Sequence, residues 1–205
     1  MKERGMIFNA EMVRALLDGR KTQTRRPIKW KKTRFTEIGE REDGSNWPWS
    51  EDAEHACDFW HPCPFGAVGD RIWVRETWAR YNIDQNSYDI AYRATTPADW
   101  PEEGRWRPSI HMPRWASRIT LEITNVGVQR LQSISPNDAA REGLVKLPAT
   151  GRYCINQGDQ YFGGASHDAR EVFSWLWESI YGADSWKANP WVWVIEFKVV
   201  NCGGD

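Results

Sequence analysis

The sequence predicts a single α+β domain, in which a small, closed or partly closed β-barrel carries a few helices. Segments with strand patterns outnumber helical ones, and the helices interrupt the strands without the regular βαβ alternation of a parallel sheet. At 205 residues the chain is long enough to bury one self-sufficient core. We therefore expect one domain over residues 1–205, with long loop insertions at about 29–66 and 81–115.

Three segments carry the start and stop signals of α-helices. The first begins after the N-cap Asn9 and ends at Gly19. The second covers residues 135–143, with serine as its N-cap, proline at the first helical position and glycine at its end. The third runs from about 167 to 181 and has one apolar face, made of Val172, Phe173, Leu176, Trp177 and Ile180.

Four segments are predicted as strands: residues 6–8, 72–78, 117–128 and 191–200. The dense apolar run of the last one indicates burial on both faces. In residues 72–78 apolar and polar side chains alternate, and Glu76 falls on the apolar side. Because an unpaired buried carboxylate is costly, Glu76 is either a functional group or the partner of a buried arginine, and we favour the structural ion pair.

Potentially reactive and anion-binding side chains are most concentrated in residues 19–27, Gly-Arg-Lys-Thr-Gln-Thr-Arg-Arg-Pro. These residues lead from the first helix into a predicted strand. Lys21 offers a base and Thr24 a hydroxyl nucleophile, and guanidinium groups for an anion come from Arg20, Arg25 and Arg26. Side chains of an extended segment alternate, so Lys21 and Thr24 share a face only if the turn after Gly19 is irregular. The alternative is an exposed basic loop followed by an edge strand.

The net charge of −1 indicates no particular partner, but the charge is unevenly distributed. Residues 1–34 carry eleven Lys and Arg against three acids, and residues 35–66 carry eight acids against one arginine. This asymmetry suits an anionic ligand near the first segment or two surface segments that neutralise each other. No apolar run is long enough to span a bilayer, and residues 1–8 lack a signal-peptide pattern. We expect a cytoplasmic protein without a membrane partner.

The four cysteines fit no disulfide framework, so free thiols are expected. His55, Cys57, His61 and Cys63 are four possible zinc ligands within nine residues, but their spacing matches none of the common zinc patterns. We expect neither a metal nor a cofactor. The alternative is a structural metal ion bound by this cluster. Most of the fourteen tryptophans are expected in the core or as loop anchors, and the candidate base-stacking residues are Trp78 and Trp115.

Four motifs follow one another along the chain. They are Gly-Arg-Lys-Thr-Gln-Thr-Arg-Arg at 19–26, Val-Gly-Asp-Arg-Ile-Trp-Val-Arg-Glu at 68–76, Ala-Arg-Glu-Gly-Leu at 140–144 and Trp-Val-Trp-Val-Ile-Glu-Phe at 191–197. Together they resemble the ASCH domain, a relative of the PUA RNA-binding fold. The Trp-rich insertions and the Pro-Trp-Val-Trp-Val ending look like the longer versions carried by bacteriophages and prophages. The resemblance implies a PUA-like barrel more strongly than it implies a function.

Small bacterial ASCH proteins include amidohydrolases that remove the acetyl group from N4-acetylcytidine. They use a lysine and a threonine of the first motif and a glutamate from the later helix, so the resemblance implies catalytic roles for Lys21, Thr24 and Glu142. A lysine with a depressed pKa activates the threonine hydroxyl, and the glutamate passes the proton to the leaving amine. The residues expected to bind the nucleoside are Arg20, Arg25, Arg26, Arg75, Glu76, Trp78 and Trp115.

Two other functions stay open at this point. Other ASCH members are thought to bind or cleave RNA, and the same basic cleft would then hold the phosphates of RNA or another single-stranded nucleic acid. A phage accessory factor would instead bind a protein through the acidic insertion, with Trp47 and Trp49 as anchors. The insertions leave the substrate of an enzyme undetermined as well.

Overall fold

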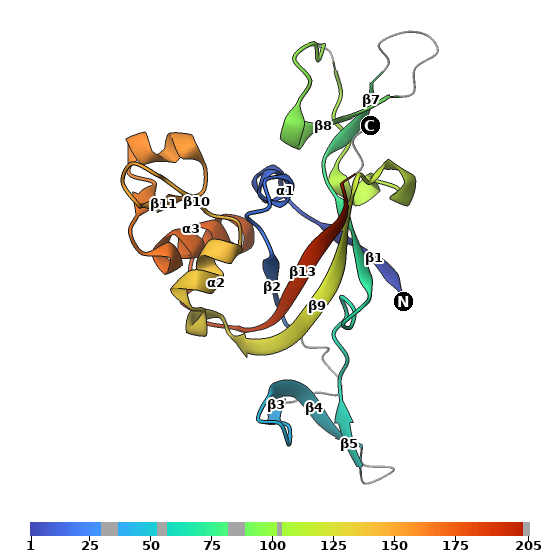
Figure 1. The fold of residues 1–205 in the computed structure, drawn as a ribbon. Coiled ribbons are helices and arrows are strands. Elements are labelled where there is room, and N and C mark those ends of the chain that lie inside the picture. The colour runs from blue at the N-terminus through green and yellow to red at the C-terminus, as the bar shows by residue number, and fades with distance from the viewer. Residues whose placement is uncertain (30–36, 53–56, 82–88, 102–103, 203–205) are drawn as a thin grey trace.

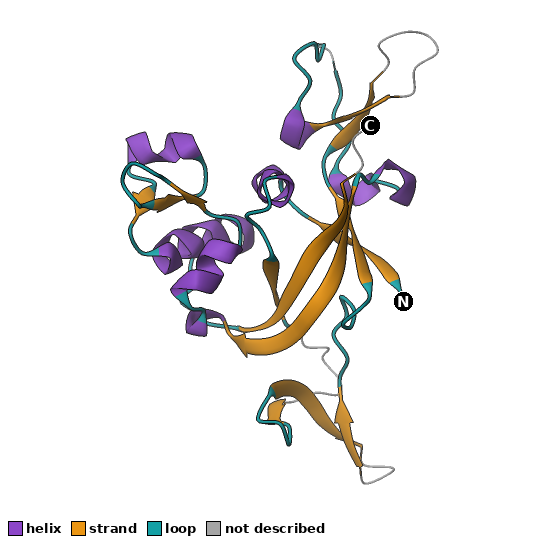
Figure 2. Cartoon of the chain, viewed as in Figure 1, coloured by secondary structure: helices purple, strands orange, loops and turns teal. Residues whose placement is uncertain are grey.

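A computed structural model describes residues 1–29, 37–52, 57–81, 89–101 and 104–202 of the chain. These residues form several β-sheets and a few helices, which confirms the α+β class (Figures 1 and 2). The largest sheet has five strands in the order β1-β6-β9-β13-β2. Their bounds are β1 Glu3–Ile7, β6 Arg71–Arg75, β9 Ile119–Arg130, β13 Trp191–Cys202 and β2 Gln23–Pro27. The pair β1–β6 is parallel, and the other neighbours are antiparallel.

The long strands β9 and β13 curve strongly, but the described strands do not close into a barrel (Figure 1). No pairing between the edge strands β1 and β2 occurs in the described residues, so of the two expected forms, a closed or a partly closed barrel, the closed one is wrong for this part of the chain. Helix α1 (Ala10–Leu17) follows β1 and precedes β2. Its buried residues Val13 and Leu16 join a hydrophobic core with residues of β1, β6, β9 and β13.

Two apolar clusters lie on opposite faces of β13. The first contains Ile195, together with residues of α1, β1, β6 and β9. The second contains Val192, together with residues of α2 (Pro136–Arg141) and α3 (Ala169–Tyr181). Because successive side chains of a strand point to opposite faces, β13 contributes to both clusters. This confirms the burial on both faces that the apolar run predicted.

The three predicted helices are present, and the first two have their predicted N-caps. The side chains of Asn9 and Ser135 accept hydrogen bonds from the backbone N–H of Met12 at 2.9 Å and of Asp138 at 3.1 Å. In α3 the predicted apolar face is buried except for Ile180, which is 38% exposed in the last turn. Local capping and periodicity therefore suffice to locate these helices.

The insertion expected as an irregular segment at 29–66 contains a three-stranded antiparallel sheet, which corrects that expectation. Its strands are β3 (Glu37–Glu40), β4 (Asn46–Asp52) and β5 (Cys57–Trp60). The strands are short, and the Trp-Pro-Trp sequence of β4 gives no alternation that a pattern search detects. Trp47 anchors this sheet, because its ring packs edge-on against Trp193 of β13 at 5.1 Å.

The segment predicted as one strand over 72–78 is two strands. Strand β6 ends at Arg75, and β7 (Trp78–Tyr81) begins a separate pair with β8 (Asp89–Tyr92). The predicted alternation of buried and partly exposed residues nevertheless continues through Glu76 and Trp78. Beyond β8 the chain forms short 3-10 turns, η1 (Arg93–Thr95), η2 (Ser109–His111) and η3 (Arg114–Ala116).

A small lobe beside α3 completes the fold (Figure 1). It consists of the 3-10 turn η5 (Gln157–Phe162) and a sheet of three short strands, β10 (Val145–Lys146), β11 (Tyr153–Cys154) and β12 (Ala165–Ser166). The 3-10 turn η4 (Leu131–Ser133) connects β9 to α2. The first strand of the lobe, β10, begins four residues after the last residue of α2.

Gly143 fixes the distance between α2 and α1, which leads to the first testable prediction. Its φ is +113°, and a Cβ there would lie 2.8 Å from the Cβ of Ala15 and 3.3 Å from that of Lys21. Gly143→Ala should therefore lose about 1–2 kcal/mol for the backbone and a further ~1–3 kcal/mol for overpacking. Urea denaturation measures the loss.

Gly151→Ala is the matched control. Its φ of +70° carries a similar backbone penalty, but nothing lies within 4 Å of the added Cβ. Equal losses for the two variants would show that the contact between Gly143 and Ala15 is not tight.

Candidate active site

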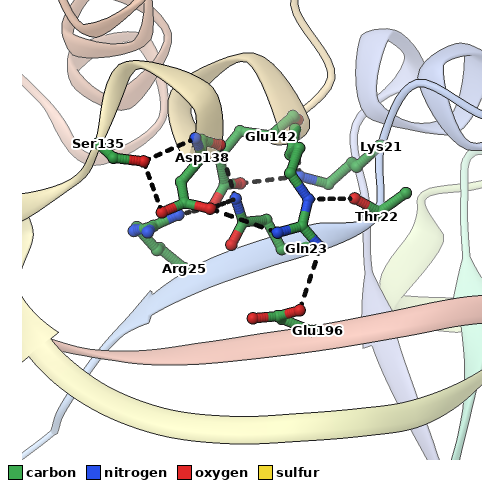
Figure 3. Close-up of polar contacts among 9 residues, drawn as sticks. Lys21, Thr22, Gln23, Arg25, Ser135, Asp138, Glu142 and Glu196 are labelled. Carbon is green, nitrogen blue, oxygen red and sulfur yellow. Dashed lines mark hydrogen bonds and ion pairs between the residues drawn. The ribbon is translucent and has the colours of Figure 1, made fainter.

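The turn between α1 and β2 directs Lys21 toward the end of α2. The backbone N–H groups of Arg20 and Lys21 both donate to the carbonyl of Ala15, at 2.9 and 3.0 Å, after Gly19 has adopted a φ of +71°. The turn is thus irregular. Lys21 Nζ donates to the Glu142 backbone oxygen at 2.8 Å and to Glu142 Oε2 at 2.9 Å (Figure 3). The side chains of Lys21 and Glu142 are 0% and 2% exposed.

Glu142 is the C-cap residue of α2, and its carboxylate forms ion pairs with two cationic side chains. Its Oε1 accepts a hydrogen bond from Arg25 Nη1 at 2.8 Å, so the carboxylate lies between Lys21 and Arg25 (Figure 3). With the side-chain amide of Gln129 of β9 assigned so that its oxygen faces Arg25, that oxygen accepts from Arg25 Nη2 at 2.6 Å and from Nε at 3.1 Å. The buried carboxylate is therefore fully paired, as a buried charge must be.

Further polar contacts join β2 and its preceding turn to α2 (Figure 3). Gln23 Nε2 donates to the backbone oxygen of Asp138 at 2.7 Å. Arg141 donates to Thr22 Oγ1 at 3.0 Å and to Glu196 Oε2 of β13 at 3.1 Å. Together with the bonds of Glu142, these contacts hold residues 21, 22, 23 and 25 against α2 and its C-terminal end.

Thr24 lies on the opposite face of β2 from this network. In the pairing with β13, Thr24 faces Ile195 and Arg25 faces Val194. Directly opposed residues of an antiparallel pair share a face, and Ile195 belongs to the first core cluster. Thr24 Oγ1 is buried without a hydrogen-bond partner among the described residues. The structure thus brings Lys21 and Glu142 together, and the described residues show no hydrogen bond from Thr24 to either.

Sequence reasoning missed Arg25 as the second partner of Glu142. The signal that could have found it is the period of two, which places residues 21, 23 and 25 on one side of the extended segment. Gln129 gave no comparable signal, because its role depends on the pairing of β9 with β13.

Burial lowers the pKa of Lys21 from its ordinary value of 10.5. The charge and hydrogen bond of Glu142 oppose this shift, and the nearby charges of Arg26 and Arg25 add to it. Desolvation is the largest cause, since the amine loses all contact with water. Lys21 therefore gives up its proton more readily than an exposed lysine, which is the property a general base needs.

The site is closed in the described conformation. A cavity of about 10 Å³ beside Glu142 has room for about one water molecule. It is lined by Glu11, Met12, Glu142, Gly143, Leu144, Ile155 and Leu176. A nucleoside would enter this cavity only after some of these residues have moved.

The arginines expected to bind a ligand are occupied by acceptors of the protein. Arg20 binds Asp18 at 2.8 Å and the backbone oxygen of Gly143. Arg26 donates to the backbone oxygen of Ile7 at 2.7 Å, and Arg75 donates to that of Ile110. The expected exposed basic cleft around the first motif is therefore not formed by these side chains in the described conformation.

The two tryptophans expected to stack on bases differ in exposure. Trp78 is 2% exposed, so its ring has no open face for a base in the described conformation. The alternation that placed it on the apolar side of the strand already indicated this burial. Trp115 is 60% exposed and is open to a ligand.

Glu76 forms a structural ion pair with an arginine, as the sequence analysis favoured. It is 2% exposed, and its two carboxylate oxygens accept from Arg118 Nε at 2.9 Å and Nη2 at 3.0 Å. Burial raises the pKa of Glu76, and the hydrogen bond and charge of Arg118 oppose that rise. The partner comes from the segment before β9, 42 residues away, and Glu76 is not available to a ligand.

No group of three or more potential metal ligands gathers among the described residues. Of the four candidates, His55 and the side chain of Cys57 lie outside the described part. Cys63 is a free thiol, and burial raises its pKa to about 11, which disfavours the thiolate that metals bind. His61 Nε2 lies 2.9 Å from Ser50 Oγ. None of the described helices is long and apolar enough to cross a membrane.

Comparison with protein-family models, with curated proteins and with solved structures finds no match to this chain. The fold and the site geometry define an α+β protein with a buried Lys-Glu-Arg cluster.

The Glu76–Arg118 pair gives a test of stability. Arg118→Ala leaves the buried carboxylate without its partner and should cost about 3–5 kcal/mol at neutral pH. Without Arg118, the pKa of folded Glu76 rises further above its unfolded value near 4.5. The folded state then binds more protons than the unfolded state above pH 4.5, so the variant should regain stability as the pH falls toward that value. Urea titrations at several pH values measure both effects.

Arg114→Ala serves as the control for this prediction. Arg114 pairs with Glu3 at 3.0 Å, but the two side chains are 46% and 35% exposed. Exposed pairs contribute about 0–1 kcal/mol, so a loss equal to that of Arg118→Ala would contradict the structural role assigned to Glu76.

Proposed function

We propose that the protein is an ASCH-type amidohydrolase that acts on an N4-acylated cytidine-type nucleoside, built on a PUA-like sheet that is open between β1 and β2. One observation carries the proposal. Lys21 Nζ lies 2.9 Å from Glu142 Oε2 although the residues are 121 positions apart, and these are two of the three groups that the resemblance requires in one site. A position of Glu142 on the far side of the sheet would have removed the basis for it.

The chemistry follows from the protonation states of these groups. Neutral Lys21 accepts the proton of a nucleophilic hydroxyl as its oxygen attacks the acyl carbon of the amide. The C–N bond then breaks, and Glu142 conveys a proton to the exocyclic amine, which leaves as cytidine. Hydrolysis of the resulting acyl ester by water releases the carboxylic acid and restores the hydroxyl.

The identity of the nucleophile depends on a movement. Thr24 Oγ1 has no internal hydrogen-bond partner, but β2 holds it on the face opposite Arg25. For Thr24 to serve as the nucleophile, the turn after Gly19 has to rearrange when the closed cavity opens. A water molecule activated by Lys21 is the alternative nucleophile, and it needs no change in β2.

Substitutions test the roles of the pair. Lys21→Met removes the amine but leaves Glu142 paired with Arg25, and it should lower acetate release from N4-acetylcytidine at least ~100-fold. Glu142→Gln should cause a similar loss, because base and proton carrier act as one unit. Thr24→Val should abolish the reaction if Thr24 is the nucleophile and leave most of it if the nucleophile is water.

The exposed pair Lys198–Glu122 on β13 and β9, at 2.7 Å, provides the matched controls. Lys198→Met and Glu122→Gln should keep wild-type acetate release. Thermal denaturation of every variant separates lost chemistry from lost folding. Wild-type protein without acetate release, or a fully active, folded Lys21→Met variant, would refute the proposal.

The lowered pKa of Lys21 makes a pH prediction. The rate should rise with pH as Lys21 loses its proton, with a midpoint below 10.5. Between the lowered folded value and 10.5 the unfolded state binds more protons, so the contribution of Lys21 to stability also rises with pH. Lys21→Met should remove this rise. Urea titrations of both proteins between pH 7 and 10 measure it, and parallel curves would mean that the pKa of Lys21 is not lowered.

A further inference from the structure

The pair β7–β8 and the turn η3 form a surface that carries an exposed aromatic ring and two exposed arginines. Trp115 of η3 packs edge-on against buried Trp78, with ring centroids 5.6 Å apart and planes at 88°. Its own ring stays 60% exposed. Beneath it, Tyr92 Oη donates to the backbone oxygen of Ala116 at 3.0 Å and holds the turn against β8. The turn that carries Trp115 is therefore anchored, while most of the Trp115 side chain stays open to solvent.

Two exposed arginines lie over the rings of this tryptophan pair, Arg80 over Trp115 and Arg107 over Trp78. Arg80 Cζ lies 5.6 Å from the centroid of Trp115, and Arg107 Cζ lies 5.3 Å from that of Trp78. Residues 78 and 80 share one face of β7, and the bridge between Trp78 and Arg107 places Arg107 on the same face. We call Trp115, Arg80 and Arg107 the Trp115 surface.

No carboxylate in the described part of the chain forms an ion pair with the arginines of the Trp115 surface. Arg114 and Arg118 nearby are paired with Glu3 and Glu76. Arg80 and Arg107, in contrast, form no salt bridge with any residue in the described ranges. Asp89 is exposed, but it is one residue from Ile90, the partner of Arg80, and therefore falls on the other face of the β7–β8 pair. Two guanidinium groups that lack an ion-pair partner among the described residues, next to an exposed indole, are complementary to a polyanion that has aromatic rings.

We propose that the Trp115 surface binds single-stranded nucleic acid, with one base stacked on Trp115 and adjacent phosphates on Arg80 and Arg107. A single strand presents unstacked bases, which a duplex does not. The inference does not depend on the amidohydrolase proposal, because no residue of the Lys21 site belongs to this surface.

Fluorescence anisotropy with labelled oligothymidine and oligouridine of about 12 nucleotides tests the proposal. Both single strands should bind, and a duplex of equal length should bind more weakly. Trp115→Ala should weaken binding at least ~5-fold, and Trp115→Phe should recover part of the loss. Arg80→Gln and Arg107→Gln should each reduce the slope of log K against log salt concentration by about 0.7. A preference for RNA would identify contacts to the 2′-hydroxyl.

Two matched controls come from other parts of the chain. Arg130→Gln removes an exposed arginine that lies 4.6 Å from the ring of Trp191, and Phe162→Ala removes an aromatic ring that is 92% exposed. Both variants should bind like the wild type. The proposal is overturned if wild-type protein binds no oligonucleotide, if Trp115→Ala binds unchanged, or if Arg130→Gln changes the salt slope as much as Arg80→Gln. Acetate release is measured separately, so failure of either proposal leaves the other intact.

Discussion

The carboxylate of Glu142, held between Lys21 and Arg25, is the contact on which the arrangement of this protein depends. It joins the turn after α1 and the edge strand β2 to the end of α2, across 121 and 117 positions of the chain. Removing one partner of such a buried cluster costs about 3–5 kcal/mol, because a desolvated charge is then left unpaired. A protein in which apolar side chains replace the whole cluster can be as stable as one that keeps it. The presence of the cluster is therefore not explained by stability alone. Its chemistry is the stronger reason to examine it for function.

The same contact explains why the site is closed. Gly143 follows Glu142 and lies against Ala15, so that α2 approaches α1 with almost no space between them. Lys21 is desolvated by this close packing, and the desolvation lowers its pKa. One packing arrangement therefore prepares the amine as a base and keeps a substrate out. An enzyme with this site needs an opening motion that the closed conformation resists.

The two proposed sites are chemically distinct. The Lys21 site is buried and satisfies its charges internally, whereas Arg80 and Arg107 are exposed and have no ion-pair partner in the described part of the chain. An internal site is suited to one small group at a time, and an exposed one to a polymer that slides along it. A protein that has both could recognise a modified base within a strand, but each activity can be tested without the other.

Local sequence determined much of the fold. The caps at Asn9 and Ser135, the strand pattern before Arg130 and the need of Glu76 for an arginine were all evident, because each depends on neighbours in the chain or on a general cost of burial. The strands of the 29–66 insertion were missed, because tertiary contacts such as that between Trp47 and Trp193 hold them, without a local period.

Only the tertiary structure decided how the predicted site residues meet. The resemblance grouped Lys21, Thr24 and Glu142, yet the register of β2 against β13 placed Thr24 with the core and gave its expected position to Arg25. Likewise, Trp78 and Trp115 were both candidates for base stacking in the sequence. Packing buries Trp78 and leaves Trp115 exposed. Strand register and the approach of α2 to α1 depend on contacts between distant segments. No local pattern encodes them, so residue types alone determined which chemistry the chain carries, and packing determined which groups can take part in it.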